Sequence, residues 1–440
     1  MSPGLIVAAP SSGSGKTLVT LGLIRHLAGT GLRVASAKVG PDYIDPAFHT
    51  AAGSRQCETL DCWAMRPQTL AAGVARLSQD ADIVICEGVM GLFDGAEGGG
   101  GATADIAALT GWPVVLVVDV RGMAASVAAL VSGFATFRSD IRLAGVIFNR
   151  VASDRHLAML ADAVARACPD IAVLGGVRRD AALAVPSRHL GLVQAGERTD
   201  LDRLLDSAAA AIGTGIDTDR LTGIARPATG SVPAADGAAL PPLGQTIAVA
   251  RDLAFSFSYP HVIGGWRRAG AGVSFFSPLE NEGPAAEADA IYLPGGYPEL
   301  HASRLAAADG FRAGMVAAAE RGAAIYGECG GFMALGEALV DGEGVSHRML
   351  GLLPLETSFA EPARHLGYRK IELRAETPLG TRGDLFRGHE FHYSRCIRAE
   401  GAPLFAAADA AGRDIGATGM VAGKVAGSYL HLIDRADGKR

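Results

Sequence analysis

Short apolar runs alternate with amphipathic, helix-length stretches along most of this chain. In the first half, the apolar runs cover residues 4–9, 33–38, 83–86, 114–118 and 143–148, with further candidate strands at 171–174 and 190–193. In the second half, they cover residues 246–250, 273–276, 290–293 and 323–326. Strands separated by helices are typical of βαβ units, which build parallel sheets. The pattern therefore predicts an α/β protein.

The alternation is interrupted between residues 213 and 244. A helix predicted over residues 201–212 is followed by a stretch with little periodicity, several glycines and the prolines Pro227, Pro233, Pro241 and Pro242. Such a composition is typical of a connecting segment. We therefore expect one domain at residues 1–212, a linker at 213–244 and a second domain at 245–440, a division that suits a chain of 440 residues.

Composition argues against several classes of protein. The net charge is −6 and no long Lys/Arg run is present, so we expect no nucleic-acid partner. No apolar run reaches the roughly 18 residues needed to span a bilayer, and no basic segment precedes the first strand, so neither a membrane span nor a signal peptide is expected. The 6 cysteines are widely spaced, which favours reduced thiols in a cytoplasmic protein over a disulfide framework or a zinc knuckle.

The first strand runs into a candidate phosphate loop, Pro10-Ser11-Ser12-Gly13-Ser14-Gly15-Lys16-Thr17, and then into an apolar helix. A glycine-rich turn before a helix lets successive backbone N–H groups face phosphate oxygens. We expect Lys16 to reach the β- and γ-phosphates of ATP and Thr17 to bind Mg²⁺. The predicted ATP-binding residues in this loop are Ser12, Gly13, Ser14, Gly15, Lys16 and Thr17. Pro10 stands where the strict motif has glycine, so the loop is a variant.

Acidic segments follow the next two strands. Ligands of open α/β sheets bind at the carboxyl ends of the strands, where these segments lie. We expect Glu87 and Asp45, with Thr17, to hold Mg²⁺. The same two loops supply the candidate substrate-binding residues Asp42, Tyr43, Ile44 and Asp94. Each carboxylate could instead be an ordinary solvated loop residue. Asn149, which follows the strand ending at residue 148, is expected to contact adenine, with an ordinary turn asparagine as the alternative.

A second candidate site lies at Gly327-Glu328-Cys329-Gly330-Gly331, between a predicted strand and an apolar segment. A Gly-x-Cys-x-Gly turn in this context resembles a nucleophile elbow, and the helix N-terminus is expected to lower the pKa of the Cys329 thiol. The backbone N–H groups of Gly330 and of Gly296, in Pro294-Gly295-Gly296-Tyr297-Pro298, are the expected oxyanion hole. His431, after a short apolar run near the C-terminus, is the expected base.

Other histidines and cysteines have alternative interpretations. His389 and His392 compete as the base, but their spacing around Glu390 does not match the helical zinc motif. We expect that segment to pack against or orient groups beside the thiol. Cys57 and Cys62 flank a loop near the candidate substrate site and are interpreted as buried small apolar residues.

Taken in order, these motifs resemble the family of cobyrinic or hydrogenobyrinic acid a,c-diamide synthases over almost the whole chain. The similarity also includes Ser187-Arg188-His189-Leu190-Gly191-Leu192, Leu293-Pro294-Gly295-Gly296-Tyr297-Pro298-Glu299 and Gly388-His389-Glu390-Phe391-His392-Tyr393-Ser394. The resemblance implies two Rossmann-like α/β domains. The first is a phosphate-loop synthetase domain similar to dethiobiotin synthetase, and the second is a flavodoxin-like class I glutamine amidotransferase domain.

The resemblance also implies a reaction. ATP with Mg²⁺ would phosphorylate an acetate carboxylate of a corrinoid, and Cys329, activated by His431, would release ammonia from glutamine to form the amide. Many class I enzymes have a glutamate two residues after the histidine, but this chain has Ile433 there, so a Cys–His dyad or an orienting group elsewhere, such as Glu390, is expected. Cobalt in the ring and a homodimer are left open.

Three alternatives share part of this pattern. Cobyric acid synthase has similar domains, although the segments around Asp42 and Glu87 favour the a,c-diamide enzyme. A nickel-sirohydrochlorin a,c-diamide synthase would share nearly every motif. A partition-type ATPase switch would explain the variant phosphate loop but not Cys329 or the second domain.

Overall fold

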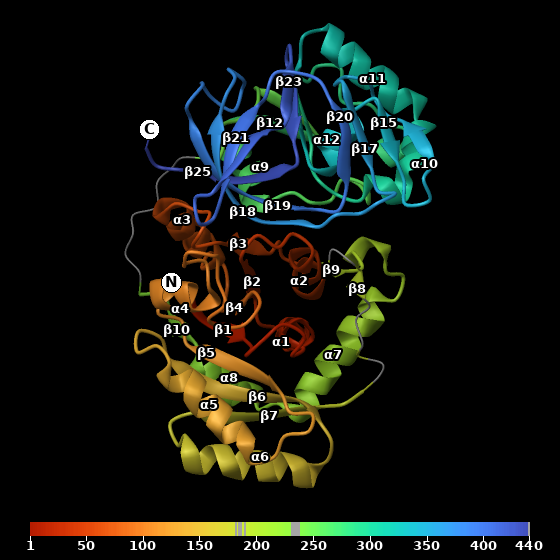
Figure 1. Cartoon of the computed structure of the whole chain (residues 1–440). Coiled ribbons are helices and arrows are strands. Elements are labelled where there is room, and N and C mark those ends of the chain that lie inside the picture. The colour runs from red at the N-terminus through yellow and green to blue at the C-terminus, as the bar shows by residue number, and fades with distance from the viewer. Residues whose placement is uncertain (181–182, 184–186, 189–190, 230–237, 439–440) are drawn as a thin grey trace. The chain divides into compact units, whose positions relative to one another are not determined.

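The computed structural model describes residues 1–180, 183, 187–188, 191–229 and 238–438. The chain forms two compact units, shown in Figure 1. The first comprises Met1–Trp63 and Leu70–Ala235, and the second comprises Ala64–Thr69 and Asp236–Arg440. Both contain a predominantly parallel sheet with helices, so the predicted α/β class is confirmed. None of the helices in the described residues is long and apolar enough to cross a membrane.

The first unit is built on an 8-stranded sheet with the order β3-β2-β4-β1-β5-β6-β7, and β10 pairs with β1. Along this order the pairs are parallel, and β10 alone is antiparallel to its neighbour. The strands are β1 (Pro3–Ala8), β2 (Val34–Val39), β3 (Glu58–Leu60), β4 (Ile83–Glu87), β5 (Val114–Asp119), β6 (Leu143–Val151), β7 (Ala172–Arg178) and β10 (Arg226–Pro227).

Helices connect these strands, and they explain the continuous apolar runs, because a parallel sheet is covered on both faces. Leu5, Ile6 and Val7 of β1 are each 0% exposed. The helices are α1 (Lys16–Gly29), α2 (Asp45–Gly53), α3 (Pro67–Leu77), α4 (Thr103–Thr110), α5 (Ser126–Thr136), α6 (Asp154–Ala167), α7 (Leu201–Gly215), α8 (Thr218–Ile224) and the 3₁₀ turn η2 (Ala195–Glu197). In Figure 1, α5 lies beside α6, which runs below β6 and β7.

The segment expected to connect the domains contains regular structure at its start. Helix α7 continues to Gly215, and α8 and β10 follow within residues 213–244. Asp217 is the N-cap of α8, and its side chain accepts a hydrogen bond from the N–H of Arg220. Short capped elements of this kind leave little periodicity in the sequence. Residues 230–237 lie outside the described residues.

The predicted strand at 190–193 is present in part, at Gly191–Leu192. The structure has a two-stranded ladder of β8 (Ser187–Arg188) and β9 (Gly191–Leu192). His189 and Leu190 of the motif at 187–192 lie outside the described residues. The prediction at 171–174 corresponds to the first half of β7, which extends to Arg178.

The second unit contains a 6-stranded sheet with the order β12-β11-β13-β14-β24-β23. Its pairs are parallel except for β23 with β24. The strands are β11 (Thr246–Ala250), β12 (Gly272–Phe276), β13 (Ala290–Leu293), β14 (Ala324–Glu328), β23 (Met420–Ala422) and β24 (Val425–Ser428). The helices are α9 (Pro260–Arg268), α10 (Ala302–Ala306), α11 (Asp309–Glu320), α12 (Gly330–Leu335) and the 3₁₀ turns η3 (Pro278–Glu280) and η4 (Pro298–His301).

Two further sheets complete the second unit, and the sequence did not predict them. One has the order β22-β21-β18-β19-β25, and the other has the order β16-β15-β17-β20. The strands are β15 (Ala338–Val340), β16 (Ser346–Arg348), β17 (Leu355–Ser358), β18 (His365–Leu373), β19 (Leu385–His392), β20 (Arg395–Ala399), β21 (Phe405–Asp409), β22 (Asp414–Thr418) and β25 (Leu430–Arg435). The first of these sheets carries the predicted base, because His431 is the second residue of β25.

Candidate functional site

The phosphate loop lies at the carboxyl end of β1, between β4 and β5 in the sheet. It borders a cavity of about 550 Å³. The lining contains most of the predicted ATP-binding residues, namely Gly13, Gly15, Lys16, Thr17 and Asn149. Ser14 is buried, and its hydroxyl donates to the carbonyl of Ser11 at 2.9 Å, whereas Ser12 is exposed at the tip of the loop. The loop is therefore pre-folded around an open space.

Gly15 is the residue whose backbone demands glycine. Its φ of 86° lies in the left-handed region, and a Cβ there would lie 2.0 Å from Nδ2 of Asn149. That amide nitrogen donates to the carbonyl of Ser14 at 2.9 Å, and Oδ1 of Asn149 accepts from the N–H of Arg150 at 2.9 Å. Asn149 thus lines the cavity and braces the loop with the same side chain.

Four arginines line the cavity: Arg121, Arg150, Arg178 and Arg179. Arg150 donates to the carbonyl of Gly13 at 3.0 Å and to Oδ2 of Asp119 at 2.6 Å. Each arginine lies at or just after the carboxyl end of β5, β6 or β7, and that position was the signal available in the sequence. With Lys16, they make this cavity suited to a polyanion.

The predicted metal ligands come together beside the loop. The Thr17 hydroxyl donates to Oε1 of Glu87 at 2.6 Å and lies 3.3 Å from Oδ2 of Asp45. Three oxygen-bearing side chains from α1, α2 and β4 therefore share one small region, and such hard oxygen donors suit Mg²⁺.

Lys38, which was not predicted as a site residue, lies among these predicted metal ligands. Its Nζ lies 2.6 Å from Oδ2 of Asp45, 2.9 Å from Oε1 of Glu87 and 3.8 Å from Oδ2 of Asp42. Lys38 projects from β2, and only 2% of its surface is exposed. The ammonium group therefore neutralises the carboxylates that were expected to hold the metal.

Burial and neighbouring charges set the protonation of this cluster. Burial alone would raise the pKa of Glu87, but Lys38 and His49 hold that pKa well below its usual value. Burial and the carboxylate of Asp42 raise the pKa of Asp45 to about 6, against the opposing effect of Lys38. Burial and the nearby Lys38 lower the pKa of Lys16. The cluster is thus a desolvated group of coupled charges.

His49 supports the other oxygen of Glu87. Its Nε2 lies 2.6 Å from Oε2 of Glu87, and its Nδ1 lies 3.6 Å from Sγ of Cys57. Burial alone would lower the pKa of His49, but Cys57 and Glu87 raise it to about 10. Cys57 is buried and Cys62 is half-buried, and Cys57 makes this polar contact in addition to its packing. Both Glu87 oxygens are therefore engaged by the protein.

The predicted substrate residues lie in two loops of the same unit. Oδ1 of Asp42 accepts from the N–H groups of Ile44 and Asp45, at 2.8 and 3.1 Å, and so braces the start of α2. Tyr43 and Ile44 are buried, at 8% and 6% exposure. Asp94 is exposed and accepts from the N–H of Gly91 at 2.9 Å.

The loop that carries Asp94 runs along the phosphate loop. Leu92 donates its N–H to the carbonyl of Ala9 at 2.8 Å, and Nζ of Lys16 donates to the carbonyl of Met90 at 3.0 Å. The exposed Asp94 carboxylate therefore lies on a loop that is fastened to the predicted phosphate site.

The cysteine turn has the backbone expected of a nucleophile elbow. Cys329 follows β14 and precedes α12, and its φ of 48° and ψ of −104° are unusual for a residue with a side chain. Its N–H donates to the carbonyl of Ser428 at 2.8 Å, which ties the turn to the end of β24. The strained turn places the side chain at the carboxyl edge of the sheet.

The thiol differs from expectation in its acidity. Burial raises the pKa of Cys329 above its ordinary value, and the carboxylate of Glu299 adds to this effect, while the N–H of Gly330 opposes it. The helix N-terminus therefore acts in the predicted direction, but desolvation outweighs it. Burial therefore favours the protonated thiol over the thiolate.

The two glycines predicted for the oxyanion hole approach each other closely. A Cβ on Gly330 would lie 2.9 Å from the backbone nitrogen of Gly296, and one on Gly296 would lie 2.0 Å from the carbonyl oxygen of Ala254. Only glycine permits this packing at either position. The structure therefore brings together the two backbone segments from which the N–H donors were expected.

His431 faces the same point as Cys329. A Cβ on Gly295 would lie 3.1 Å from Nε2 of His431 and 3.3 Å from Cβ of Cys329, so the two side chains meet over a glycine. His431 is 0% exposed, and burial together with His389 and His392 lowers its pKa to about 3. It is a neutral imidazole here, as a general base must be.

The segment with His389 and His392 packs beside the thiol. Oε2 of Glu390 accepts from Arg369 at 2.7 Å and its Oε1 lies 3.0 Å from Nε2 of His392, so both oxygens of this carboxylate already have partners. The His392 ring stacks on Tyr429 with centroids 3.9 Å apart. The carbonyl oxygen of Phe391 lies 3.9 Å from Sγ of Cys329.

Three side chains of this region could together hold a metal ion, because ligand atoms of His365, Glu390 and His392 lie within 4.8 Å of one another. The guanidinium of Arg369, however, already neutralises the Glu390 carboxylate.

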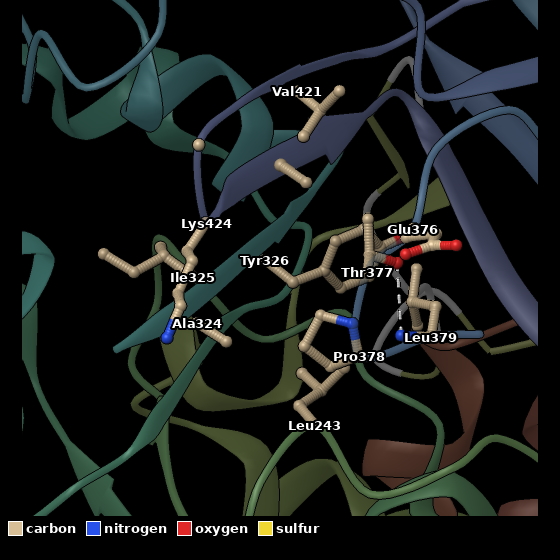
Figure 2. Close-up of a pocket in the computed structure, with 12 residues that line it drawn as sticks. Leu243, Ala324, Ile325, Tyr326, Glu376, Thr377, Pro378, Leu379, Val421 and Lys424 are labelled. Carbon is tan, nitrogen blue, oxygen red and sulfur yellow. Dashed lines mark hydrogen bonds between the residues drawn. The ribbon is translucent and has the colours of Figure 1, made fainter. Parts of the chain in front are cut away.

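A smaller cavity of about 60 Å³ lies elsewhere in the second unit, and Figure 2 shows its lining. It is bordered by the first three residues of β14, by Lys424, and by the turn Glu376–Leu379. Cys329 and His431 are not among its lining residues. Tyr326 points into it, and the same tyrosine contributes to the surroundings of Glu328.

Comparison with known proteins matches the two parts of the chain to two different domain families. Residues 5–193 match the CobQ/CobB/MinD/ParA nucleotide binding domain, and residues 246–438 match the CobB/CobQ-like glutamine amidotransferase domain. A hydrogenobyrinate a,c-diamide synthase of Rhizobium meliloti is 54% identical over 437 residues, which is 98% of this chain and 99% of the relative. The enzymes of that name from Brucella anthropi and Mesorhizobium japonicum are 53% and 51% identical, each over 98% of both chains.

Proposed function

Because the chain belongs to the family of hydrogenobyrinate a,c-diamide synthases, we propose that it amidates the a and c acetate groups of hydrogenobyrinic acid, or of its cobalt form cobyrinic acid, in cobalamin biosynthesis. The reaction consumes ATP and glutamine and belongs to the cytoplasm, where both are supplied. One observation carries the proposal. The same chain holds a cation-lined cavity beside a phosphate loop and, in its other unit, a strained cysteine that meets a buried histidine.

The first unit activates the carboxylate. Lys16, the loop N–H groups and the arginines of the cavity hold the triphosphate, and Asn149 keeps the loop in place beside adenine. The acetate oxygen attacks the γ-phosphorus, the bond to the β–γ bridging oxygen breaks, and ADP and an acyl phosphate result. Cations placed around the transferred group stabilise the charge that spreads over its oxygens.

Thr17, Asp45 and Glu87 are the residues that would hold Mg²⁺. Their oxygen donors suit this ion, and the ion would neutralise charge on the phosphates when bound. Because Nζ of Lys38 lies 2.6 to 2.9 Å from two of these carboxylates, Lys38 competes with any second cation there. We propose that Lys38 shares the carboxylates with the ion and adds positive charge near the transferred phosphoryl group.

The second unit supplies ammonia. The Cys329 thiol gives its proton to Nε2 of His431, and the thiolate attacks the side-chain carbonyl of glutamine. The N–H groups of Gly296 and Gly330 stabilise the oxyanion. His431 returns the proton to the leaving nitrogen, so ammonia departs and a thioester remains, which water hydrolyses to glutamate and free thiol. The ammonia displaces phosphate from the acyl phosphate, and the cycle repeats at the second acetate.

Asp42, Tyr43, Ile44 and Asp94 are proposed to contact the corrinoid. Asp94 is exposed on a loop that is bonded to the phosphate loop, so it can orient a polar edge of the ring near the transferred phosphate. Asp42 braces the start of α2 and so positions Tyr43 and Ile44.

Turnover of hydrogenobyrinic acid and of cobyrinic acid, each with ATP and glutamine and with products identified by mass, tests the proposal. We expect a gain of two amides and consumption of two ATP for one or both substrates. Four amides on a diamide substrate would instead indicate a cobyric acid synthase, and turnover of nickel-sirohydrochlorin alone would indicate the nickel enzyme. Absence of ATP-dependent amidation of all these substrates would overturn the proposal.

A further inference from the structure

Glu328, the residue immediately before Cys329, lies behind the catalytic histidine. Its Oε2 is 3.9 Å from Nδ1 of His431, on the other side of the ring from the meeting point with Cys329. The residue is 2% exposed. Its Oε1 accepts from the N–H of Leu432 at 3.1 Å, and its Oε2 accepts from the hydroxyl of Tyr292 at 2.7 Å. The carboxylate is therefore fixed from two strands beside the imidazole.

The strand that carries His431 cannot itself provide such a carboxylate. Ile433, two residues after His431, is buried and apolar, and it lies where the pairing of β25 with β19 shifts register. The Asp434 carboxylate is engaged elsewhere. It accepts from the N–H of Arg66 at 2.8 Å and from the Arg66 guanidinium at 2.9 and 3.1 Å. Glu390 is likewise engaged, by Arg369 and His392.

We propose that Glu328 is the positioning residue of the Cys329–His431 pair: its carboxylate orients the imidazole through Nδ1 and stabilises the imidazolium that forms when Cys329 loses its proton. A buried imidazolium needs a nearby negative charge, because burial strongly disfavours an isolated one. The distance of 3.9 Å is longer than a hydrogen bond, but at this separation a carboxylate attracts an imidazolium directly. Catalytic hydrogen bonds are often long before substrate binds. The inference rests on the proposed roles of Cys329 and His431.

The surroundings of Glu328 make this contribution depend on pH. Burial raises the pKa of Glu328 to about 7, while the hydroxyls of Tyr292 and Tyr326 and the N–H of Leu432 oppose that rise. The ionisable groups that face it are thus Tyr292 on β13, Tyr326 on β14, His431 on β25 and the adjacent Cys329. Only the carboxylate form can stabilise the imidazolium. Glutaminase activity should therefore rise with pH through this pKa and fall as the carboxylate is protonated below it.

Glu328→Gln tests the inference in the full-length enzyme. The amide keeps an acceptor for Leu432 but loses the charge, so we expect kcat for glutamine hydrolysis to fall on the order of 100-fold with little change in KM. The acidic limb of the pH profile near neutrality should disappear. Amidation with ammonium chloride as nitrogen donor should proceed at the parent rate, which reports an intact synthetase unit. Glu390→Gln, at the competing carboxylate, should keep the acidic limb.

Tyr292→Phe provides a milder variant if Glu328→Gln does not fold. Removing the hydroxyl that stabilises the carboxylate should move the acidic limb to higher pH. Parent-like glutaminase kinetics and pH profile in Glu328→Gln would overturn the inference, as would an unmoved limb in Tyr292→Phe. Cys329→Ala distinguishes a failure of the proposed function from a failure of the role of Glu328 alone. If it retains glutaminase activity, the proposed function fails. If it is inactive while Glu328→Gln is unaffected, only the role of Glu328 fails.

Discussion

The hydroxyl of Thr17 donates a hydrogen bond of 2.6 Å to Oε1 of Glu87, and so joins the end of the phosphate loop to the end of β4. Glu87 is 0% exposed, and its two oxygens also meet Lys38 at 2.9 Å and His49 at 2.6 Å. Glu87, which we propose holds Mg²⁺, is therefore also the centre of a buried charge cluster, and we expect its substitution to affect both catalysis and stability.

Glu87→Gln should abolish amidation with glutamine and with ammonia alike, because both routes need the phosphoryl transfer. The variant should also lose about 3 kcal/mol of unfolding free energy, since Lys38 and His49 lose a buried partner charge. Steady-state rates and urea denaturation measure the two effects. Glu58→Gln on β3 is the matched control, because Glu58 pairs with Arg76 at 2.9 Å in a more exposed setting worth about 1 kcal/mol or less. Parent-like rates with both donors would remove Glu87 from the site.

Lys38→Met should be strongly destabilising. The methionine fills the space but leaves the carboxylates of Asp45 and Glu87 without their ammonium partner in a buried setting, which costs about 3–5 kcal/mol. The double variant Lys38→Met/Glu87→Gln should recover part of this loss, because it removes one of the stranded charges. Denaturation of the two single variants and the double variant measures the coupling. Lys370→Met, at a half-buried lysine of β18, is the control, and equal effects at both lysines would contradict the assignment.

Lys16→Ala should reduce amidation with either nitrogen donor by several orders of magnitude. The lost charge serves the phosphoryl transition state, where such groups contribute on the order of several kcal/mol. Glutamine hydrolysis at Cys329 should persist, because that site lies in the other unit. Measuring ADP release and glutamate release in the same reaction distinguishes these effects. A variant that forms diamide at the parent rate would show that the loop has another role.

The sequence predicted those parts of the fold that depend on local pattern. Buried parallel strands give continuous apolar runs, so most strands of the two central sheets were located to within a residue or two. The two smaller sheets of the second unit were missed, because strands such as β18 and β19 mix polar and apolar residues without a long apolar run. The elbow at Cys329 and the loop at Lys16 were recognisable because their chemistry is contained in a few consecutive residues.

The remaining features of the sites depend on contacts between distant segments. Lys38 meets Glu87 because β2 pairs with β4, and it meets Asp45 at the start of α2, while the only local signal was a lysine within an apolar strand. Glu328 approaches His431 because β14 and β25 converge, although the two residues are about a hundred positions apart. The acidity of the Cys329 thiol was predicted in the wrong direction for the same reason. The helix N-terminus is visible in the sequence, whereas the burial that outweighs it is a property of the folded unit.

Cys329→Ala should abolish amidation with glutamine while amidation with ammonia stays close to the parent rate. The change removes the nucleophile, but the phosphate loop, the cation-lined cavity and the charge cluster all belong to the first unit. Alanine is tolerated sterically, because it only deletes the sulfur. Product formation with saturating glutamine and with ammonium chloride at high pH, where free ammonia is available, measures the difference. Cys396→Ala is the matched control, since Cys396 is an exposed cysteine of the same unit and should leave both rates unchanged. Equal loss of both activities in Cys329→Ala would show that the two units do not divide the chemistry as proposed.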